Sequence, residues 1–261
     1  MNAATLASHL EYLRLGQVAE NYEEMAKQAA SKNWSHVEYL QRLLDCEYQY
    51  RQQRALERRI RAARFPVVKT LDQFDWNWPK KINRPQVQNL FRLAFLAQRS
   101  NAVFVGGVGL GKSHLAVALS YEACQRGHSV LFTTAIDAVN NLIAAQTTHR
   151  LKAELKRYLA PDLLCMDELG YLPLDKTGAD LLFQVISQRY DTGGAVVLTS
   201  NKPFAEWAHV FAGDAVMASA ALDRLLHKAT VVNIRGDSYR LRERRQAGAT
   251  DSLLTNPQPK A

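Results

Sequence analysis

Residues 102–113 read AVFVGGVGLGKS, an apolar strand that runs directly into a glycine-rich turn and then into a helix. The pattern Gly106-x-x-x-x-Gly111-Lys112-Ser113, after a strand and before a helix, has the context of a Walker A motif, or P-loop. Glycines let backbone N–H groups converge on phosphate oxygens, and the N-terminus of the following helix adds a favourable dipole. The stretch therefore predicts a site for the phosphates of a nucleoside triphosphate.

Each residue type of this loop has an expected role. Lys112 is expected to reach the β- and γ-phosphates of ATP, and the Ser113 hydroxyl is expected to bind Mg²⁺. A glycine-rich turn without a ligand is the alternative, which the correct spacing and both flanking elements disfavour. The predicted ATP-binding residues of the loop are Gly106, Gly107, Val108, Gly109, Leu110, Gly111, Lys112, Ser113 and His114.

A second motif, Leu163-Leu-Cys-Met-Asp167-Glu168, is an apolar strand that ends in two carboxylates. It has the pattern of a Walker B motif, in which Asp167 holds Mg²⁺, directly or through water, and Glu168 polarises the attacking water. On its own such a strand end is more often simply solvated, but a P-loop in the same chain favours the catalytic interpretation. The adjacent glutamate also favours ATP hydrolysis over nucleotide binding alone.

The next apolar run, residues 196–199, is followed by the polar residues Ser200 and Asn201. Ligands of doubly wound parallel sheets lie beyond the carboxyl ends of the strands, so Asn201 is expected to orient the water or to contact the γ-phosphate. The alternative is that residues 200–203 form an ordinary turn and helix cap. The predicted catalytic residues of these motifs are Lys112, Asp167, Glu168 and Asn201.

Strand-length apolar runs alternate with helical patterns from residue 102 onward. The runs at 102–105, 130–133, 163–166, 196–199 and 231–234 predict an α/β domain with a parallel five-stranded sheet flanked by helices. A helical stretch is expected before them, from Pro85 to about Gln98. Residues 1–64 are helical in pattern, and Phe65-Pro66 ends their last helix. We therefore expect a helical N-terminal domain at 1–64, an ATPase domain at 65–245 and a disordered tail at 246–261.

The chain of 261 residues has a formal net charge of +8 and a pI near 9.4, which favours a polyanionic partner such as nucleic acid. A basic enzyme without such a partner is the alternative. Three scattered cysteines, Cys46, Cys124 and Cys165, offer neither a disulfide framework nor a zinc-ligand spacing. No signal peptide is evident, and the longest apolar runs are far shorter than a membrane span. We expect a cytoplasmic protein without membrane contact.

The order of these motifs resembles that of the AAA+ ATPases of the initiator and helicase-loader clade. Within that clade the chain is similar, over nearly its whole length, to the IstB-like ATP-binding proteins of insertion-sequence transposition. The strings that carry the resemblance are, in chain order, Leu13-Arg-Leu-Gly-Gln-Val-Ala, Glu38-Tyr-Leu-Gln-Arg-Leu-Leu-Asp-Cys-Glu47, Phe74-Asp-Trp, Gly111-Lys-Ser-His114-Leu115, Asp167-Glu-Leu-Gly-Tyr171, Ala220-Ala-Leu-Asp-Arg224-Leu-Leu and Gly236-Asp-Ser-Tyr-Arg240-Leu-Arg.

The resemblance implies roles for two further arginines. Arg224 matches a catalytic arginine finger, which enters the nucleotide site of a neighbouring subunit in a homo-oligomer. Arg240 matches a sensor-2-like arginine that contacts ATP. A surface arginine on a basic protein is the alternative for either residue. Only 27 residues follow Ile234 (261 − 234), too few for a full C-terminal lid domain, a shortage shared with IstB-like and DnaC-like proteins.

Arginines are concentrated near the end of the helical N-terminal part. Arg51, Arg54 and Arg58 share a helix face, because they are spaced three and four residues apart. Such a face can follow a nucleic-acid backbone, since arginine pairs bidentately with phosphate, although a solvated amphipathic helix is the alternative. The resemblance favours duplex DNA, bound by salt-sensitive contacts that are largely independent of sequence. The predicted DNA-binding residues are Arg51, Arg54, Arg58, Arg59 and Arg61.

Together these features predict an ATP-dependent transposition helper that oligomerises on target DNA and presents it to the transposase of the same element, with hydrolysis driving disassembly. A DnaC-like replicative helicase loader shares the whole ATPase core and is the alternative. Such loaders engage a helicase through an N-terminal domain that in some members carries zinc ligands, and the first 64 residues here contain one cysteine and no such set. A small-molecule kinase on a P-loop core is the third class. It lacks support, because such enzymes need neither a sensor asparagine nor an arginine finger.

Overall fold

The computed structural model describes residues 3–239, so Arg240 and the predicted tail at 246–261 lie outside the described residues. The chain divides into two compact units, Met1–Arg58 and Arg59–Ala261, and the division falls inside helix α3 (His36–Ala63). The domain boundary that the sequence predicts after residue 64 lies just beyond the last residue of α3, a few residues after this division. Within residues 3–239, no helix is long and apolar enough to cross a membrane.

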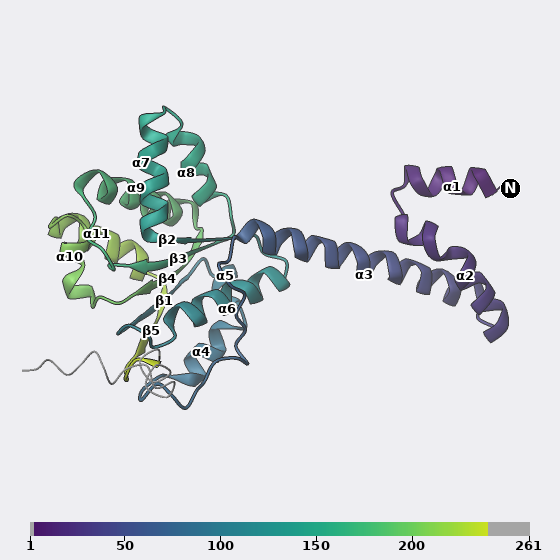
Figure 1. Ribbon diagram of the computed structural model, residues 1–261, viewed down its shortest axis with the longest axis horizontal. Coiled ribbons are helices and arrows are strands. Elements are labelled where there is room, and N and C mark those ends of the chain that lie inside the picture. The colour runs from purple at the N-terminus through teal and green to yellow at the C-terminus, as the bar shows by residue number, and fades with distance from the viewer. Residues whose placement is uncertain (1–2, 240–261) are drawn as a thin grey trace, which may run out of the picture. The chain divides into compact units, whose positions relative to one another are not determined.

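A parallel five-stranded sheet lies at the centre of the second unit and confirms the predicted α/β fold (Figure 1). Its strand order is β2-β3-β4-β1-β5, so the strand before the P-loop lies between β4 and β5. Helices cover both faces of such a sheet, which is why its strands are nearly continuous apolar runs. The strands are β1 (Asn101–Gly106), β2 (Val130–Thr134), β3 (Leu163–Leu169), β4 (Ala195–Ser200) and β5 (Ala229–Ile234).

The helices of this unit form one layer on each face of the sheet (Figure 1). On one face α7, α9 and α11 bury their apolar side chains against strand residues such as Val103 and Met166, which forms the main core. On the other face α6 packs against β1, β3 and β4. The helices are α4 (Arg84–Leu90), α5 (Ala94–Ala97), α6 (Lys112–Gln125), α7 (Ala135–Thr147), α8 (Leu151–Leu159), α9 (Lys176–Thr192), α10 (Trp207–Val210) and α11 (Ala215–Leu226), with a 3-10 turn at Phe204–Glu206.

One predicted helix is interrupted in the structure. The helical stretch expected from Pro85 to about Gln98 consists of the two short helices α4 and α5 with a break between them. Leu93 lies between them with a φ of +59°, a left-handed conformation that breaks the regular hydrogen bonding of a helix. Its side chain is buried, which indicates that packing determines the break.

The first unit contains helices α1 (Ala3–Tyr12), α2 (Gly16–Lys32) and the greater part of α3, as the predicted helical N-terminal part requires. Its core is small and comprises Leu10, Val18 and Leu43, with partly buried aromatic and aliphatic side chains packed around them. A core of this size buries little apolar surface, and a polar contact between the helices adds to it.

Glu47 of α3 provides such a contact. Its buried carboxylate accepts hydrogen bonds from the backbone N–H groups of Gln17, at 2.8 Å, and Val18, at 3.3 Å, in the first turn of α2. Desolvation raises the pKa of Glu47, but hydrogen bonds from Arg51 and from these two N–H groups outweigh it and leave the pKa below its ordinary value. The charged form of Glu47 therefore joins the start of α2 to α3.

Candidate functional site

The P-loop connects β1 to α6, and its glycines determine its shape. Gly111 is the N-cap of α6 and has a φ of +84°, a left-handed conformation that favours glycine. A Cβ atom there would also lie 2.6 Å from the ring of Phe74. At the other end of the loop, a Cβ atom on Gly106 would overlap the carbonyl oxygen of Ile234. Packed neighbours at both ends therefore require a loop without side chains at these two positions.

Lys112 and Ser113 form the first turn of α6, at the positive end of its dipole. The Lys112 side chain is buried, and its Nζ donates to the Gly107 carbonyl oxygen at 2.7 Å. Ser113 Oγ donates to Asp167 Oδ1 at 2.9 Å. The two residues predicted to bind Mg²⁺ are thus in direct contact. A hydroxyl and a carboxylate fit this ion, because Mg²⁺ prefers oxygen ligands and takes the remainder from phosphate and water.

Glu168 lies at an irregularity of β3. The register between β3 and β4 shifts between Met166 and Leu169, and Glu168 has a φ of +61°. The Glu168 side chain is exposed, whereas the Asp167 side chain beside it is buried. Non-glycine residues in such sparsely populated conformations cluster at functional sites. The two carboxylates have different environments, which suits a metal ligand next to a residue that contacts water.

Thr199 of β4 is a site residue that the sequence did not reveal. Its Oγ1 donates to Asp167 Oδ1 at 2.5 Å and accepts the backbone N–H of Glu168 at 2.9 Å. The residue is only 1% exposed, so both bonds form away from water. The sequence offered one signal for this role, a single threonine in the apolar run that follows the Walker B strand along the chain. That signal is weak, since β-branched residues are common in any strand.

Asn201 follows β4, which lies beside β1, so it stands at the same carboxyl edge of the sheet as the P-loop. Its Oδ1 atom is buried and has no hydrogen-bond partner among the described residues. Buried amide oxygens are rarely unpaired, so this one suits contact with a ligand or water. The turn considered as the alternative is present as well, because Ser200 Oγ accepts the backbone N–H of Lys202 at 3.1 Å.

Two segments that are distant in sequence contact the P-loop and α6. His114 Nε2 lies 2.9 Å from the carbonyl oxygen of Thr70, and burial lowers the pKa of His114. On the other side, the backbone N–H of Tyr239 donates to the Gly109 carbonyl oxygen at 2.9 Å. The His114 side chain, predicted to contact ATP, therefore contacts the segment before β1. Arg240 comes directly after Tyr239, outside the described residues.

Arg224 lies at the amino edge of the sheet, opposite the P-loop. Asn101, the first residue of β1, donates from Nδ2 to the carbonyl oxygen of Leu225 at 2.9 Å. The P-loop begins at Gly106, the last residue of β1, about 17 Å further along the strand. The structure therefore does not bring Arg224 together with the P-loop of its own chain.

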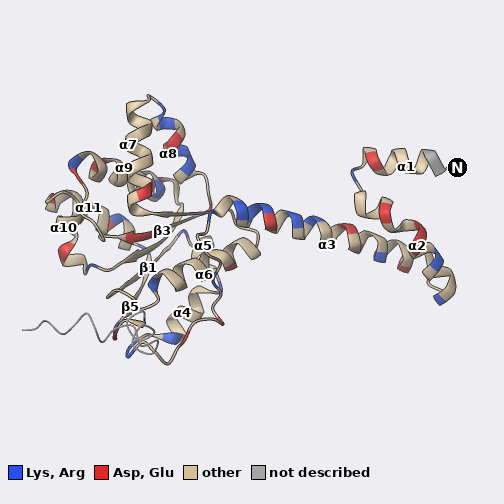
Figure 2. Ribbon diagram, in the orientation of Figure 1, with Lys and Arg blue, Asp and Glu red and all other residues tan. Residues whose placement is uncertain are grey.

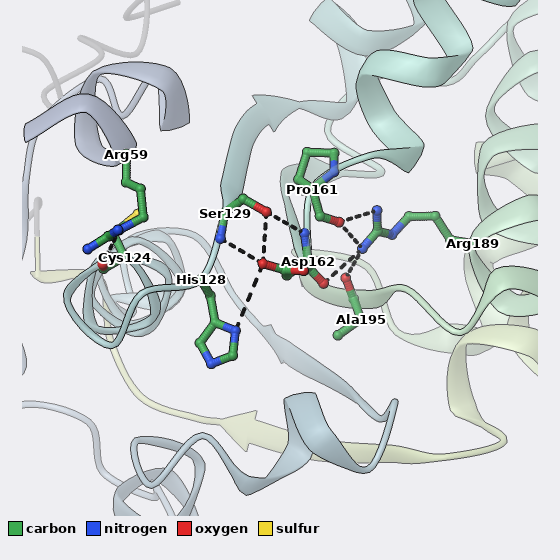
Figure 3. Close-up of polar contacts among 8 residues, drawn as sticks. All are labelled: Arg59, Cys124, His128, Ser129, Pro161, Asp162, Arg189 and Ala195. Atoms are coloured by element: carbon green, nitrogen blue, oxygen red, sulfur yellow. Dashed lines mark hydrogen bonds and ion pairs between the residues drawn. The ribbon is translucent and has the colours of Figure 1, made fainter. Parts of the chain in front are cut away.

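The amino edge is held together by polar contacts around the buried Arg189 (Figure 3). The Arg189 side chain is 1% exposed, and burial lowers its pKa to about 10. Close by, Asp162 Oδ2 accepts both the backbone N–H and the hydroxyl of Ser129 at 2.8 Å. These contacts join the starts of β2, β3 and β4. The guanidinium of Arg189 donates, at 2.6–3.2 Å, to the carbonyl oxygens of Tyr158, Pro161, Asp162 and Ala195.

Arg59, predicted to bind DNA, is the first residue of the second unit and bonds another residue of that unit. Its side chain is half-buried, and its Nε donates to the Cys124 carbonyl oxygen at 3.0 Å (Figure 3). This bond joins the end of α3 to α6. Arg59 thus has a structural role at the start of the second unit.

The other predicted DNA-binding arginines are exposed along α3, whose C-terminal half carries most of its basic side chains (Figure 2). Arg51 pairs with Glu47 at 2.8 Å, and Arg54 pairs with Glu57 at 3.3 Å. Arg58 and Arg61 form no ion pair with any residue that the structure describes. Among the four exposed arginines, Arg58 and Arg61 therefore have the least compensated charges.

Comparison with known proteins identifies the family that this chain matches. The family model of the IstB-like ATP binding protein matches residues 8–247. The ATP-binding protein of insertion sequence IS21 from Pseudomonas aeruginosa is 41% identical over 246 residues, 94% of this chain and 92% of the relative. That of insertion sequence IS5376 from Geobacillus stearothermophilus is 41% identical over 233 residues, 89% and 92% of the two chains. The DnaC helicase loader has a similar fold, with a TM-score of 0.53 and 22% identity over 64% of this chain and 96% of the loader.

Proposed function

The chain belongs to the family of IstB-like ATP binding proteins, and on that basis we propose that it is an ATPase that assembles on target DNA and presents it to the transposase of its insertion sequence. ATP hydrolysis then drives disassembly. ATP binding is a property of the family. ATP hydrolysis, DNA binding and contact with the transposase are what we propose. Residues 1–64 bind DNA or the partner in this proposal, and residues 65–245 form the ATPase domain.

The contacts at the carboxyl edge of the sheet support hydrolysis. Ser113 and Asp167, which are in direct contact, would hold Mg²⁺, and the ion would neutralise charge on the β- and γ-phosphates. Glu168 is exposed beside them and polarises the attacking water. Thr199 orients both carboxylate residues, and Asn201 contacts the water or the γ-phosphate. Lys112 moves from the Gly107 carbonyl to the phosphates.

The observation that carries the oligomeric part of the proposal is the position of Arg224. Arg224 and the P-loop lie at opposite edges of the same sheet. An arginine finger that acts within one chain would have to lie at the carboxyl edge. We therefore infer that Arg224 enters the nucleotide site of a neighbouring subunit, in a head-to-tail arrangement. Each ATP then lies between two subunits.

The exposed arginines of α3 support DNA binding. Arg51, Arg54, Arg58 and Arg61 recur at spacings of three and four residues, and all four side chains are exposed. No base-reading motif accompanies them, so their contacts are made with phosphates. Binding is then largely independent of sequence and weakens as the salt concentration rises.

The helicase-loader alternative has weaker support. Its similarity to this chain lies in the fold alone, at 22% identity to the DnaC helicase loader, whereas the insertion-sequence relatives are 41% identical over almost the whole chain. Pull-downs against the transposase and against a replicative helicase separate the two functions. Capture of the helicase alone would support the loader.

The Glu168→Gln variant tests the proposal, because glutamine keeps the size of the side chain but cannot polarise water as a carboxylate does. With ATP, Mg²⁺ and long duplex DNA, we expect this variant to form assemblies that persist, while wild-type assemblies dissociate as ATP is consumed. Mass photometry and negative-stain imaging measure the formation of the assemblies and how long they persist. Monomers under all these conditions would refute the proposal, and rapid turnover by the variant would remove Glu168 from its role.

A further inference from the structure

Two neutral groups hold Arg224 in place. Its Nη1 donates to the Ala220 carbonyl oxygen at 3.0 Å, and its guanidinium carbon lies 5.1 Å from the centroid of the Phe183 ring. No carboxylate among the described residues pairs with Arg224. By contrast, five other described arginines each pair with a glutamate three or four residues away, namely Arg42, Arg51, Arg54, Arg126 and Arg157.

The ring of Phe183 belongs to a well-anchored helix. Phe183 lies on α9, is half-buried and packs against the main core of the second unit. Its neighbour Leu182 is fully buried, and α9 packs against α11, which carries Arg224. A guanidinium over an aromatic face is attracted by the quadrupole of the ring. Phe183 is therefore a fixed platform under a long side chain that would otherwise sample many rotamers.

The surroundings of Arg224 leave its charge available to an anion. Arg224 lines a cavity of about 400 Å³ at the amino edge of the sheet. Three further cations, Arg99, Arg189 and Lys228, line the same cavity, although the Arg189 guanidinium already donates to backbone carbonyl oxygens. Asp191 is the acidic residue among the lining side chains. Asp191 forms no ion pair with Arg224 or with any other residue that the structure describes. A cluster of like charges raises the potential that an approaching phosphate would meet.

We propose that Phe183 is a positioning residue for the arginine finger: it holds the Arg224 guanidinium in place without neutralising it. This inference rests on the proposed function, in which Arg224 meets phosphates bound to a neighbouring subunit. A carboxylate at position 183 would hold the guanidinium more strongly, but it would compete with the phosphate for the same N–H donors. An aromatic face engages the cation and leaves those donors free, apart from the one given to Ala220.

The Phe183→Leu variant of the full chain tests this role, because leucine keeps an apolar side chain in the core but removes the aromatic face. With ATP, Mg²⁺ and duplex DNA, we expect kcat to fall about 3- to 30-fold, the range of a cation–π contact. The KM for ATP should stay unchanged, since the finger acts in the transition state. Phe183→Tyr retains the ring and should retain kcat. The matched control is Phe65→Leu, a half-buried ring that packs against Tyr121 and Phe132, and it should also retain kcat.

A double-mutant cycle with Arg224→Ala distinguishes positioning from simple packing. If Phe183 acts only through Arg224, Phe183→Leu causes no further loss of kcat when Arg224 is already alanine. An equal loss of kcat in both backgrounds would overturn the role of Phe183 but leave the finger in place. The same conclusion would follow if Phe183→Leu had wild-type kcat while Arg224→Ala was slow. Wild-type kcat for Arg224→Ala would overturn the finger itself, and with it the proposed site between subunits.

Discussion

Thr199 joins the two acidic residues of the site, since its hydroxyl donates to Asp167 and accepts the backbone N–H of Glu168. Thr199→Val keeps the shape of the side chain and removes both bonds. We expect kcat to fall about 10- to 100-fold, because a hydrogen bond to a charged group contributes about 1.5–3 kcal/mol. ATP affinity should change little, and Thr199→Ser should retain activity. Steady-state ATPase assays with equilibrium ATP binding measure this, and wild-type kcat for Thr199→Val would contradict it.

At this scale the sequence predicted the residues that belong to contiguous motifs. The P-loop, Asp167 and Glu168 were recognisable because their spacing is local and their chemistry is specific. Thr199 was not, because its role depends on the pairing of β3 with β4. The contact of the His114 side chain with Thr70 likewise depends on packing between segments 44 residues apart.

At the scale of elements, Glu47 stabilises the start of α2, and its effect depends on pH. Its pKa is below the ordinary 4.5, so its contribution is fully present above that value and is lost as the pH falls through the lower folded pKa. We expect Glu47→Gln to destabilise α2 at neutral pH by about 1 kcal/mol. The difference from wild type should shrink in acid.

Hydrogen exchange of the α2 amides, corrected for its intrinsic pH dependence, measures this difference. The matched control is Glu57→Gln, because Glu57 pairs with Arg54 at the surface of the same helix. A difference between wild type and Glu47→Gln that does not change with pH would contradict the role given to the charge.

The arginines of α3 differ in their contacts: Arg59 bonds α6, whereas the exposed arginines are the ones that we propose bind DNA. We expect Arg58→Ala and Arg61→Ala to weaken duplex DNA binding and to lower the salt dependence by about one counterion per arginine. Arg59→Ala should reduce stability and leave the salt dependence unchanged, because Arg59 bonds the Cys124 carbonyl. Arg126→Ala, an exposed arginine of α6 paired with Glu122, is the control. Fluorescence anisotropy across a salt series checks this, and an unaltered slope for the Arg58/Arg61 double variant would remove α3 as the DNA surface.

Element types were more predictable than element ends and breaks. All five strands were expected from their apolar runs, since strands buried on both faces are hydrophobic throughout. The break between α4 and α5 was not, because neither glycine nor proline marks Leu93, and its left-handed conformation follows from burial. The arginine pattern indicated a helix face, but it could not separate Arg59, which bonds α6, from its exposed neighbours.

At the scale of the whole molecule, the central feature is a sheet with the P-loop at one edge and Arg224 at the other. In the proposed function, one chain therefore carries the two halves of a nucleotide site on opposite edges of this sheet. The sequence suggested this only through resemblance to a family, because distances between motifs in space are set by the fold. The strand order and the contact between Asn101 and Leu225 provide the physical basis for a shared site.

Subunit mixing tests the shared site most directly. Glu168→Gln leaves a defective nucleotide site with an intact finger, and Arg224→Ala leaves an intact site without a finger. Each variant alone should be nearly inactive with ATP, Mg²⁺ and duplex DNA. Mixed one to one, they should recover about a quarter of the wild-type ATPase rate, since about half of the sites are intact and about half of those meet an intact finger. A mixture no more active than its two components would contradict a site completed by a neighbouring subunit.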